Sequence, residues 1–99
     1  MGAMTGKVFE FSITDSGDLY STPTVGMPLP LTIGVTLEPA DIAAGTAITV
    51  YYSRNNGRTY DILAVVTTAK WEDICDSGIT NVKFRRTAGT GTTAKAEGC

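Results

Sequence analysis

The sequence contains no histidine among its 99 residues. A Ser–His–Asp catalytic arrangement, metal binding through imidazole and side-chain pH switching near neutrality are therefore excluded. No evident base accompanies Cys75, and the carboxylates occur singly, mostly on expected turns, so no facing acid/base pair is predicted. We expect no enzymatic activity, no catalytic residue, no bound metal and no cofactor.

Cysteine is also scarce, with only Cys75 and Cys99 present. Two cysteines are too few for a disulfide framework, so we expect separate free thiols, which fits an intracellular compartment. No apolar run approaches the ~20 residues of a membrane span, and no signal-peptide pattern occurs, so no membrane partner is expected. The net charge of −2 argues against general nucleic-acid binding, which needs a basic excess.

What the chain does contain is threonine, with 16 copies, and glycine, with 11. Threonine with valine, isoleucine and tyrosine favours strands, and glycine with Asp and Asn favours the turns between them. The length predicts one domain over residues 1–99. Residues 1–6 are expected to form a flexible N-terminal arm, of which Met1–Ala3 are either native or a cloning remnant before Met4.

Two stretches show the strand period most clearly. Leu29 to Leu37 alternates apolar with polar or small residues, and Thr46 to Val66 reads as two strands around a turn at Asn56-Gly57. On the return strand the alternation places Tyr60, Ile62, Ala64 and Val66 on one face.

The remaining segments complete the prediction. Thr67–Gly78 is interpreted as either a short helix or a loop with Trp71 inserted as a plug. Glu38–Gly45 could hold one helical turn, with Pro39 tolerated at its start and Gly45 ending it, but a loop is the prediction. We expect an all-β fold, a single small antiparallel β-sandwich or jelly-roll-like barrel of six to eight short strands. The further strands are expected at Lys7–Thr14, Ile79–Thr87 and Thr92–Glu97, with at best a short edge strand in Leu19–Met27.

The segment Ser53–Tyr60 fits the pattern S-x-N-x-G-x-T-Y. It resembles the Asp-box of sialidases and related β-propellers, a hairpin-tip motif remote from catalysis whose small polar side chains bind turn amides and whose aromatic residue anchors the tip. The motif occurs once, so no propeller is implied. A structural role is favoured over a calcium or ligand role for Asn55. The residues of this structural hairpin tip are Ser53, Asn55, Asn56, Gly57, Thr59 and Tyr60.

Charged and aromatic side chains supply the candidate contacts. Lys83 and Arg85 share the outward face of one expected strand, either as a solvated face or as a contact for the acidic segment Glu72–Asp76 of a neighbouring copy. Trp71, Tyr51 and Tyr20 are either core residues or exposed aromatics suited to an interface or to sugar stacking.

The second half of the chain, Thr46–Glu97, resembles a module of small virion structural proteins of tailed bacteriophages. The resemblance is carried by Ile48–Ser53, Asn56–Tyr60, Ile79–Arg85 and Thr87–Gly91. It implies a head decoration, or cement, protein that binds the major capsid protein on the outer capsid surface of the virion, after synthesis in the host bacterial cytoplasm.

A homotrimer is expected on this interpretation, because several weak contacts made together gain avidity. The contacts would come from residues 1–7, Leu19–Leu29 and Thr67–Gly78. The alternatives are a tail, fibre or baseplate accessory component and a carbohydrate-binding module centred on Trp71, Glu72 and Asp73. The candidate partner-interface residues are Met4, Tyr20, Met27, Trp71, Lys83 and Arg85.

Overall fold

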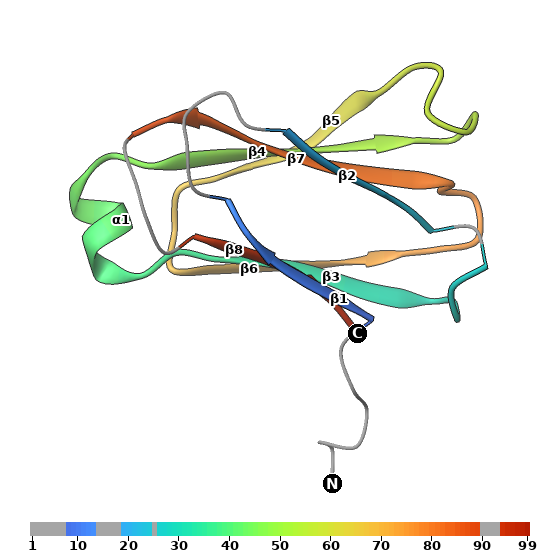
Figure 1. Ribbon diagram of the computed structural model, residues 1–99, viewed down its shortest axis with the longest axis horizontal. Coiled ribbons are helices and arrows are strands. Elements are labelled where there is room, and N and C mark those ends of the chain that lie inside the picture. Colours follow the sequence, from blue (N-terminus) through green and yellow to red (C-terminus); the bar gives the residue numbers. More distant parts are fainter. Residues whose placement is uncertain (1–7, 14–18, 25, 90–93) are drawn as a thin grey trace, which may run out of the picture.

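The computed structural model describes residues 8–13, 19–24, 26–89 and 94–99. Within them, eight strands form two antiparallel four-stranded sheets that lie one above the other (Figure 1). The helix α1 (Pro39–Ala43) lies at one end of the two layers. The strands are β1 (Phe9–Ser12), β2 (Leu19–Pro23), β3 (Leu31–Thr36), β4 (Ala47–Ser53), β5 (Asp61–Val66), β6 (Lys70–Cys75), β7 (Asn81–Ala88) and β8 (Lys95–Gly98).

The strand order is β1-β8-β3-β6 in one sheet and β2-β7-β4-β5 in the other. The strands pair in a nested order, from the first with the last to the two in the middle: β1 with β8, β2 with β7, β3 with β6 and β4 with β5. This is the pairing of one long hairpin folded over into two layers, the jelly-roll arrangement. The predicted all-β sandwich is confirmed, and the described sheets do not close into a barrel.

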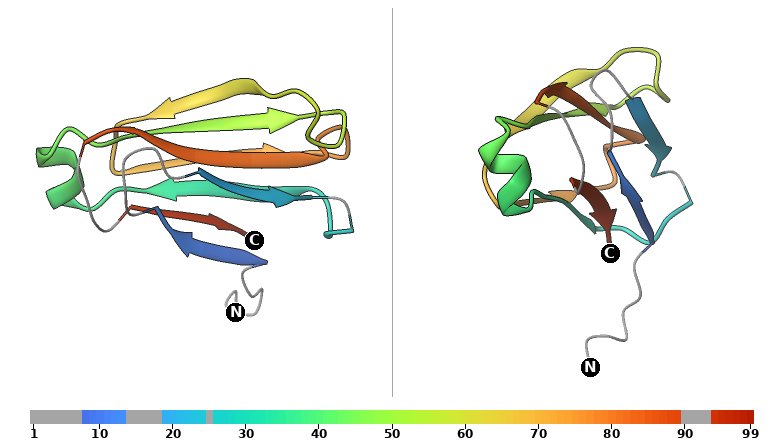
Figure 2. Two further views of the ribbon diagram at one scale, coloured as in Figure 1. Left: turned by 45° about the horizontal axis from the view of Figure 1, so that its top comes forward. Right: turned by 60° about the vertical axis from the view of Figure 1, so that its left-hand side comes forward.

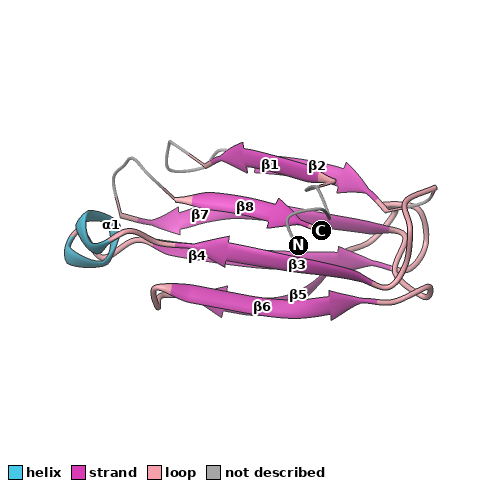
Figure 3. Ribbon diagram, turned by 90° about the horizontal axis from the view of Figure 1, so that it is seen from below, coloured by secondary structure: helices cyan, strands magenta, loops and turns pink. Residues whose placement is uncertain are grey.

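The two sheets stack strand over strand. Seen from below, β1 and β2 run along one long side and β5 and β6 along the other (Figure 3). The views in Figure 2 show the same two layers, with α1 beside the ends of the strands. Each sheet therefore has one inner face toward the other sheet and one outer face toward solvent.

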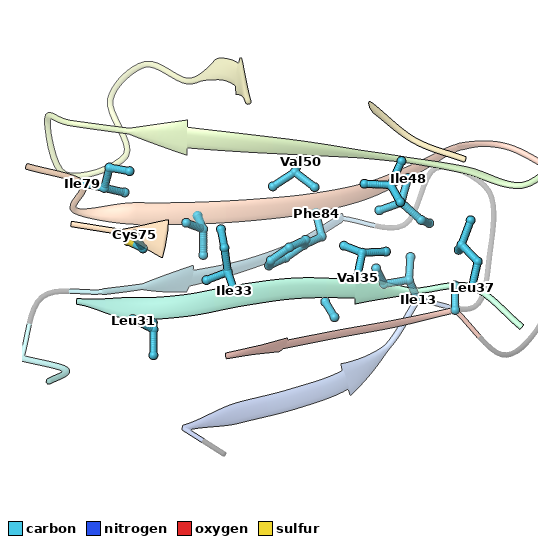
Figure 4. Packing of buried hydrophobic residues seen from close by; sticks show 14 residues of the cluster. Ile13, Leu31, Ile33, Val35, Leu37, Ile48, Val50, Cys75, Ile79 and Phe84 are labelled. Carbon is cyan, nitrogen blue, oxygen red and sulfur yellow. The ribbon is translucent and has the colours of Figure 1, made fainter. Parts of the chain in front are cut away.

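The core lies between these inner faces. Ile33 and Val35 of β3 face Ile48 and Val50 of β4 and Phe84 of β7, and all five side chains are buried (Figure 4). Burying an aliphatic or aromatic side chain contributes about 1.5–3 kcal/mol, so these alternating residues decide which face of each strand points inward. Val82, Phe84, Ala94 and Ala96 are buried in the same core.

Two of the expected segments differ from the prediction. Glu38–Gly45 is not a loop, because its residues Pro39–Ala43 form α1. A capping box stabilises this helix: the Glu38 side chain binds the Asp41 amide, and Asp41 Oδ2 accepts from the Glu38 amide at 2.9 Å. Thr67–Gly78 is neither a helix nor a plug loop, since its residues Lys70–Cys75 form the edge strand β6.

The predicted face of the return strand is wrong at Tyr60 and Ile62, which lie on the outer face while Val66 is buried. The register pairs Val50 with Ala64 but Tyr51 with Ile62, so Leu63 is the additional residue of a β-bulge. The bulge turns Ile62 to the outer face, where 61% of the residue is exposed, while Leu63 packs against the core. Among the described helices, none is both long and apolar enough to cross a membrane.

Candidate interaction surface

The outer face of the β2-β7-β4-β5 sheet gathers aromatic, cationic and apolar side chains. Its strands alternate between buried residues and residues that point outward, so Tyr51 follows buried Val50 and Lys83 precedes buried Phe84. The register places Ile62, Tyr51 and Lys83 in one row across the sheet. The next row holds Val65, Thr49 and Arg85. We call this surface the basic face and define it by Tyr51, Tyr60, Ile62, Val65, Lys83 and Arg85.

The ammonium group of Lys83 is held between two aromatic rings. Its Nζ lies 3.8 Å from the ring centroid of Tyr60 and 4.9 Å from that of Tyr51. A cation over an aromatic ring is stabilised by roughly 0.5–1 kcal/mol at an exposed site. The hydroxyls of Tyr60 and Ser21 are hydrogen-bonded at 3.3 Å, which ties Tyr60 to the edge strand β2. The positive charge of Lys83 is therefore held at a defined place on the sheet.

Exposed aliphatic side chains lie on the same outer face as this cation, two strands away on β5. Ile62 is 61% exposed and Val65 is 57% exposed, and both lie on the outer face of β5. A single exposed aliphatic residue is ordinary on a protein surface. Here two of them share a face with two tyrosines and an arginine, which matches the residue types enriched at protein–protein interfaces.

Charge is distributed unequally between the two sheets. The exposed bases Arg54, Arg58 and Arg85 belong to the β4–β5 hairpin loop and to β7, and the one acid on the described strands of this sheet is Asp61, at the start of β5. The strands of the other sheet carry mainly acids. Their exposed or half-buried charged residues are Glu10, Lys70, Glu72, Asp73, Lys95 and Glu97.

The hairpin tip is held by its own side chains. Ser53 Oγ accepts hydrogen bonds from the amides of Asn55 and Gly57 at 3.2 and 2.9 Å. Asn55 Oδ1 accepts from Ser53 Oγ at 2.8 Å and from the Thr59 amide at 3.0 Å. Asn56 and Gly57 adopt positive φ angles of 64° and 85°. The tip is therefore a compact turn whose polar atoms serve its own backbone.

This turn also positions the basic face. The next residue after Thr59 is Tyr60, whose ring covers Lys83 and whose hydroxyl lies near Gly57. Asn56 is tied to the adjoining loop by its amide, which donates to Thr80 Oγ1 at 2.8 Å. Asn55 Oδ1, the oxygen that could bind calcium or another ligand, already accepts hydrogen bonds from Ser53 Oγ and from the Thr59 amide.

The other candidate residues lie apart from this surface. Tyr20 points inward and stacks on Phe11, with ring centroids 5.0 Å apart. Met27 and Trp71 are partly buried against the core. Met4 lies outside the described residues. Of the candidate interface residues, the structure thus brings together Lys83 and Arg85.

Both cysteines are free thiols, as predicted, with Cys75 buried and Cys99 exposed. Burial raises the pKa of the Cys75 thiol, and the nearby Asp76 carboxylate adds to the increase, whereas a hydrogen bond with Thr24 opposes it. The described part of the chain contains no pocket and no cluster of three or more residues arranged to hold a metal ion.

Comparison with known protein families, curated proteins and solved structures finds no match to this chain.

Proposed function

We propose that the protein is a head decoration protein of a tailed bacteriophage. It binds the outer surface of the assembled capsid through the major capsid protein and stabilises the shell. It acts as a homo-oligomer, a trimer on the interpretation of the sequence, and is carried on the virion after synthesis in the host cytoplasm. The resemblance of Thr46–Glu97 to small phage virion proteins supplies this identity.

The observation that carries an adhesive role is the basic face. Its cation is fixed by two tyrosine rings, and exposed Ile62 and Val65 lie on the same outer face, on β5 beyond the intervening strand β4. Side chains that are already ordered lose little conformational entropy on binding, so a surface of this kind is preorganised for a partner. Tyrosine and arginine are enriched at protein–protein interfaces, so Tyr51, Tyr60 and Arg85 suit contact with another protein surface.

Multivalency explains how such a small protein would reinforce a capsid. Each copy makes a modest contact, but an oligomer that spans several capsid subunits must lose all its contacts before it leaves. The same linkage opposes separation of the subunits, because a ligand that binds only the assembled shell stabilises that shell.

The carbohydrate-binding alternative depends on Trp71 as a stacking platform. The indole of Trp71 is partly buried against the core, which leaves less of the ring for a sugar. The structure therefore favours a protein partner over a glycan. A tail, fibre or baseplate component would use the same surface chemistry and is separated from decoration by experiment.

The test is to mix the purified chain with expanded capsids that lack decoration, and in parallel with purified tails. We expect saturable binding to capsids and a rise in the capsid melting temperature. Absence of both effects would contradict the proposal. Saturable binding to tails alone would support the tail or baseplate alternative.

A further inference from the structure

We infer that the basic face binds the β6 edge of a second copy of this chain. The inference rests on the proposed function, for which it supplies the contact that builds the oligomer. Its basis is the charge and exposure of the two surfaces.

The β6 edge is acidic and carries an exposed aliphatic residue. Glu72 and Asp73 are exposed, and the next residue of the strand, Ile74, is 60% exposed. Asp76 follows the strand directly and is also exposed. Lys70 is the one base on this strand, and it pairs with Glu72 at 3.4 Å. The edge as a whole therefore has a negative charge.

The basic face is complementary to this edge in both charge and apolar character. It presents Lys83 and Arg85 for the carboxylates of Glu72 and Asp73, while Ile62 and Val65 are available to cover Ile74. Complementary charges fix the relative orientation of two partners and disfavour wrong pairings. Covering exposed aliphatic groups adds the non-directional part of the free energy.

The two surfaces do not suit self-pairing. A contact between two basic faces would place Lys83 and Arg85 against the same cations of the other copy, and a contact between two β6 edges would oppose carboxylates. Asp73 pairs in register with buried Ile33, so this carboxylate lies on the inward side of the edge strand. An inward-pointing charge on an edge strand opposes the addition of another strand. The β6 edge is thus suited to packing against the face of a sheet and not to hydrogen-bonded pairing with another strand.

The geometry of this contact is compatible with a ring. The β6 edge lies along a long side of the sandwich, whereas the basic face is the broad outer surface of the other sheet (Figure 3). An edge-to-face contact is heterologous and turns each copy relative to the previous one. Heterologous contacts close into rings when the rotation allows it, which suits the expected trimer.

Two sets of charge reversals test the contact. One variant carries Lys83→Glu and Arg85→Glu on the basic face, and the other carries Glu72→Lys and Asp73→Lys on β6. A control variant carries Arg58→Glu and Lys95→Glu at two exposed positions, which changes the net charge as much as the first variant does, but outside both proposed contact surfaces. Circular dichroism and unfolding midpoints establish that each variant folds.

Sedimentation measures the mass of each variant and of their mixtures at low salt. We expect the wild type and the control to form the oligomer, and each of the two interface variants to associate at least about tenfold more weakly. A mixture of the two variants offers the wild-type contact in one direction and a charge-swapped but still complementary contact in the other, so the two variants should co-assemble although neither associates well alone. Combining all four substitutions in one chain should restore the oligomer.

Several results would overturn the inference. They are a wild-type chain that stays monomeric at high concentration, a basic-face variant with the wild-type mass, and a mixture that does not associate. Capsid binding is measured separately on the same samples. A monomer that binds capsids saturably would refute this inference and leave the proposed function intact. An oligomer that depends on these contacts but does not bind capsids would support this inference and contradict the proposed function.

Discussion

A single buried thiol links the stability of this protein to pH. Cys75 is the last residue of β6 and is fully buried in the core cluster. Burial raises its pKa in the folded state, because the thiolate would lose its hydration there. The unfolded chain has the ordinary thiol pKa of about 8.5, so at alkaline pH the unfolded state loses this proton first.

We therefore predict that Cys75 contributes stability below the ordinary thiol pKa, and that this contribution is lost as the pH rises through the raised pKa of the folded state. The free energy of unfolding, measured by urea titration at several pH values from 7 to about 10, should fall more steeply for the wild type than for Cys75→Ala. Equal slopes for the two proteins would contradict the prediction. Cys99, which is exposed, should react with a thiol reagent in the native protein well before Cys75 does.

Two glycines with positive φ angles test the role of space around the backbone. Gly89 has φ +86°, and a Cβ there would lie 2.5 Å from Thr46 Cα. Gly45 has φ +76°, but a Cβ there would meet nothing within 4 Å. The clash at Gly89 is with main-chain atoms, which cannot rotate away as the end of a side chain could.

Both alanine variants should be less stable than the wild type, but by different amounts. Gly45→Ala should cost about 1 kcal/mol, the usual penalty of a left-handed conformation. Gly89→Ala adds the backbone clash and should cost about 3 kcal/mol or more. Chemical denaturation of the two variants gives both values, and a similar loss in each would mean that the contact with Thr46 has no effect.

At the scale of elements, the hairpin tip behaves as one hydrogen-bonded unit. Ser53 is buried, and its Oγ serves the amides of Asn55 and Gly57. We predict that Ser53→Ala lowers the free energy of unfolding by about 1–3 kcal/mol, because it leaves these donors without their acceptor. Asn55→Asp is the matched control. It retains the acceptor for the Thr59 amide, loses only the bond from Nδ2 to Thr59 Oγ1, and should change stability by less than about 1 kcal/mol.

The variants also report on the basic face, since the tip positions Tyr60. Ser53→Ala should increase the mobility of the Tyr60 ring and of Lys83, measured by NMR of the aromatic and ammonium groups. A variant with wild-type stability and unchanged ring motion would show that the turn is held by its backbone alone.

The central strand β3 could be predicted from the sequence, but the edge strand β6 could not. In β3, Leu31, Ile33 and Val35 all point to the core, so the two-residue period is complete. In β6 the inward positions are Trp71, Asp73 and Cys75. An edge strand lies beside solvent, so a carboxylate is tolerated on its inward side, and the interrupted period resembles helical spacing.

Short-range irregularities account for the other differences. The bulge at Leu63 follows from the pairing of β5 with β4, and nothing in the sequence DILAVV shows where the register shifts. The helix α1 is capped by a glutamate, whereas the preferred N-cap residues are Ser, Thr, Asp and Asn. In each case a tertiary or capping interaction outweighed the local pattern.

At the scale of the whole molecule, the basic face depends on the register of three segments. Tyr51, Tyr60 and Lys83 come from β4, from the hairpin loop and from β7, and they meet because β4 pairs with β7. The sequence alone showed that Lys83 and Arg85 share an outward face. It did not show which aromatic and aliphatic residues would surround them, because that requires the pairing of β4 with both of its neighbours.

The sandwich also makes the same chemical change harmless on one face and damaging on the other. Val65 on β5 is 57% exposed, whereas Val50 on the neighbouring strand β4 is fully buried. Threonine has nearly the shape of valine, so Val→Thr tests the hydroxyl alone. We predict that Val50→Thr lowers the free energy of unfolding by about 1–3 kcal/mol, because the threonine hydroxyl would be buried among apolar core side chains with no hydrogen-bond partner placed for it. Val65→Thr should change the unfolding free energy by no more than about 0.5 kcal/mol.

If Val65 contacts a second copy, this variant should nevertheless weaken self-association, so sedimentation together with urea unfolding separates the two roles. A Val65→Thr protein with normal association would remove this residue from the contact, and one with a large loss of stability would contradict its place on the outer face.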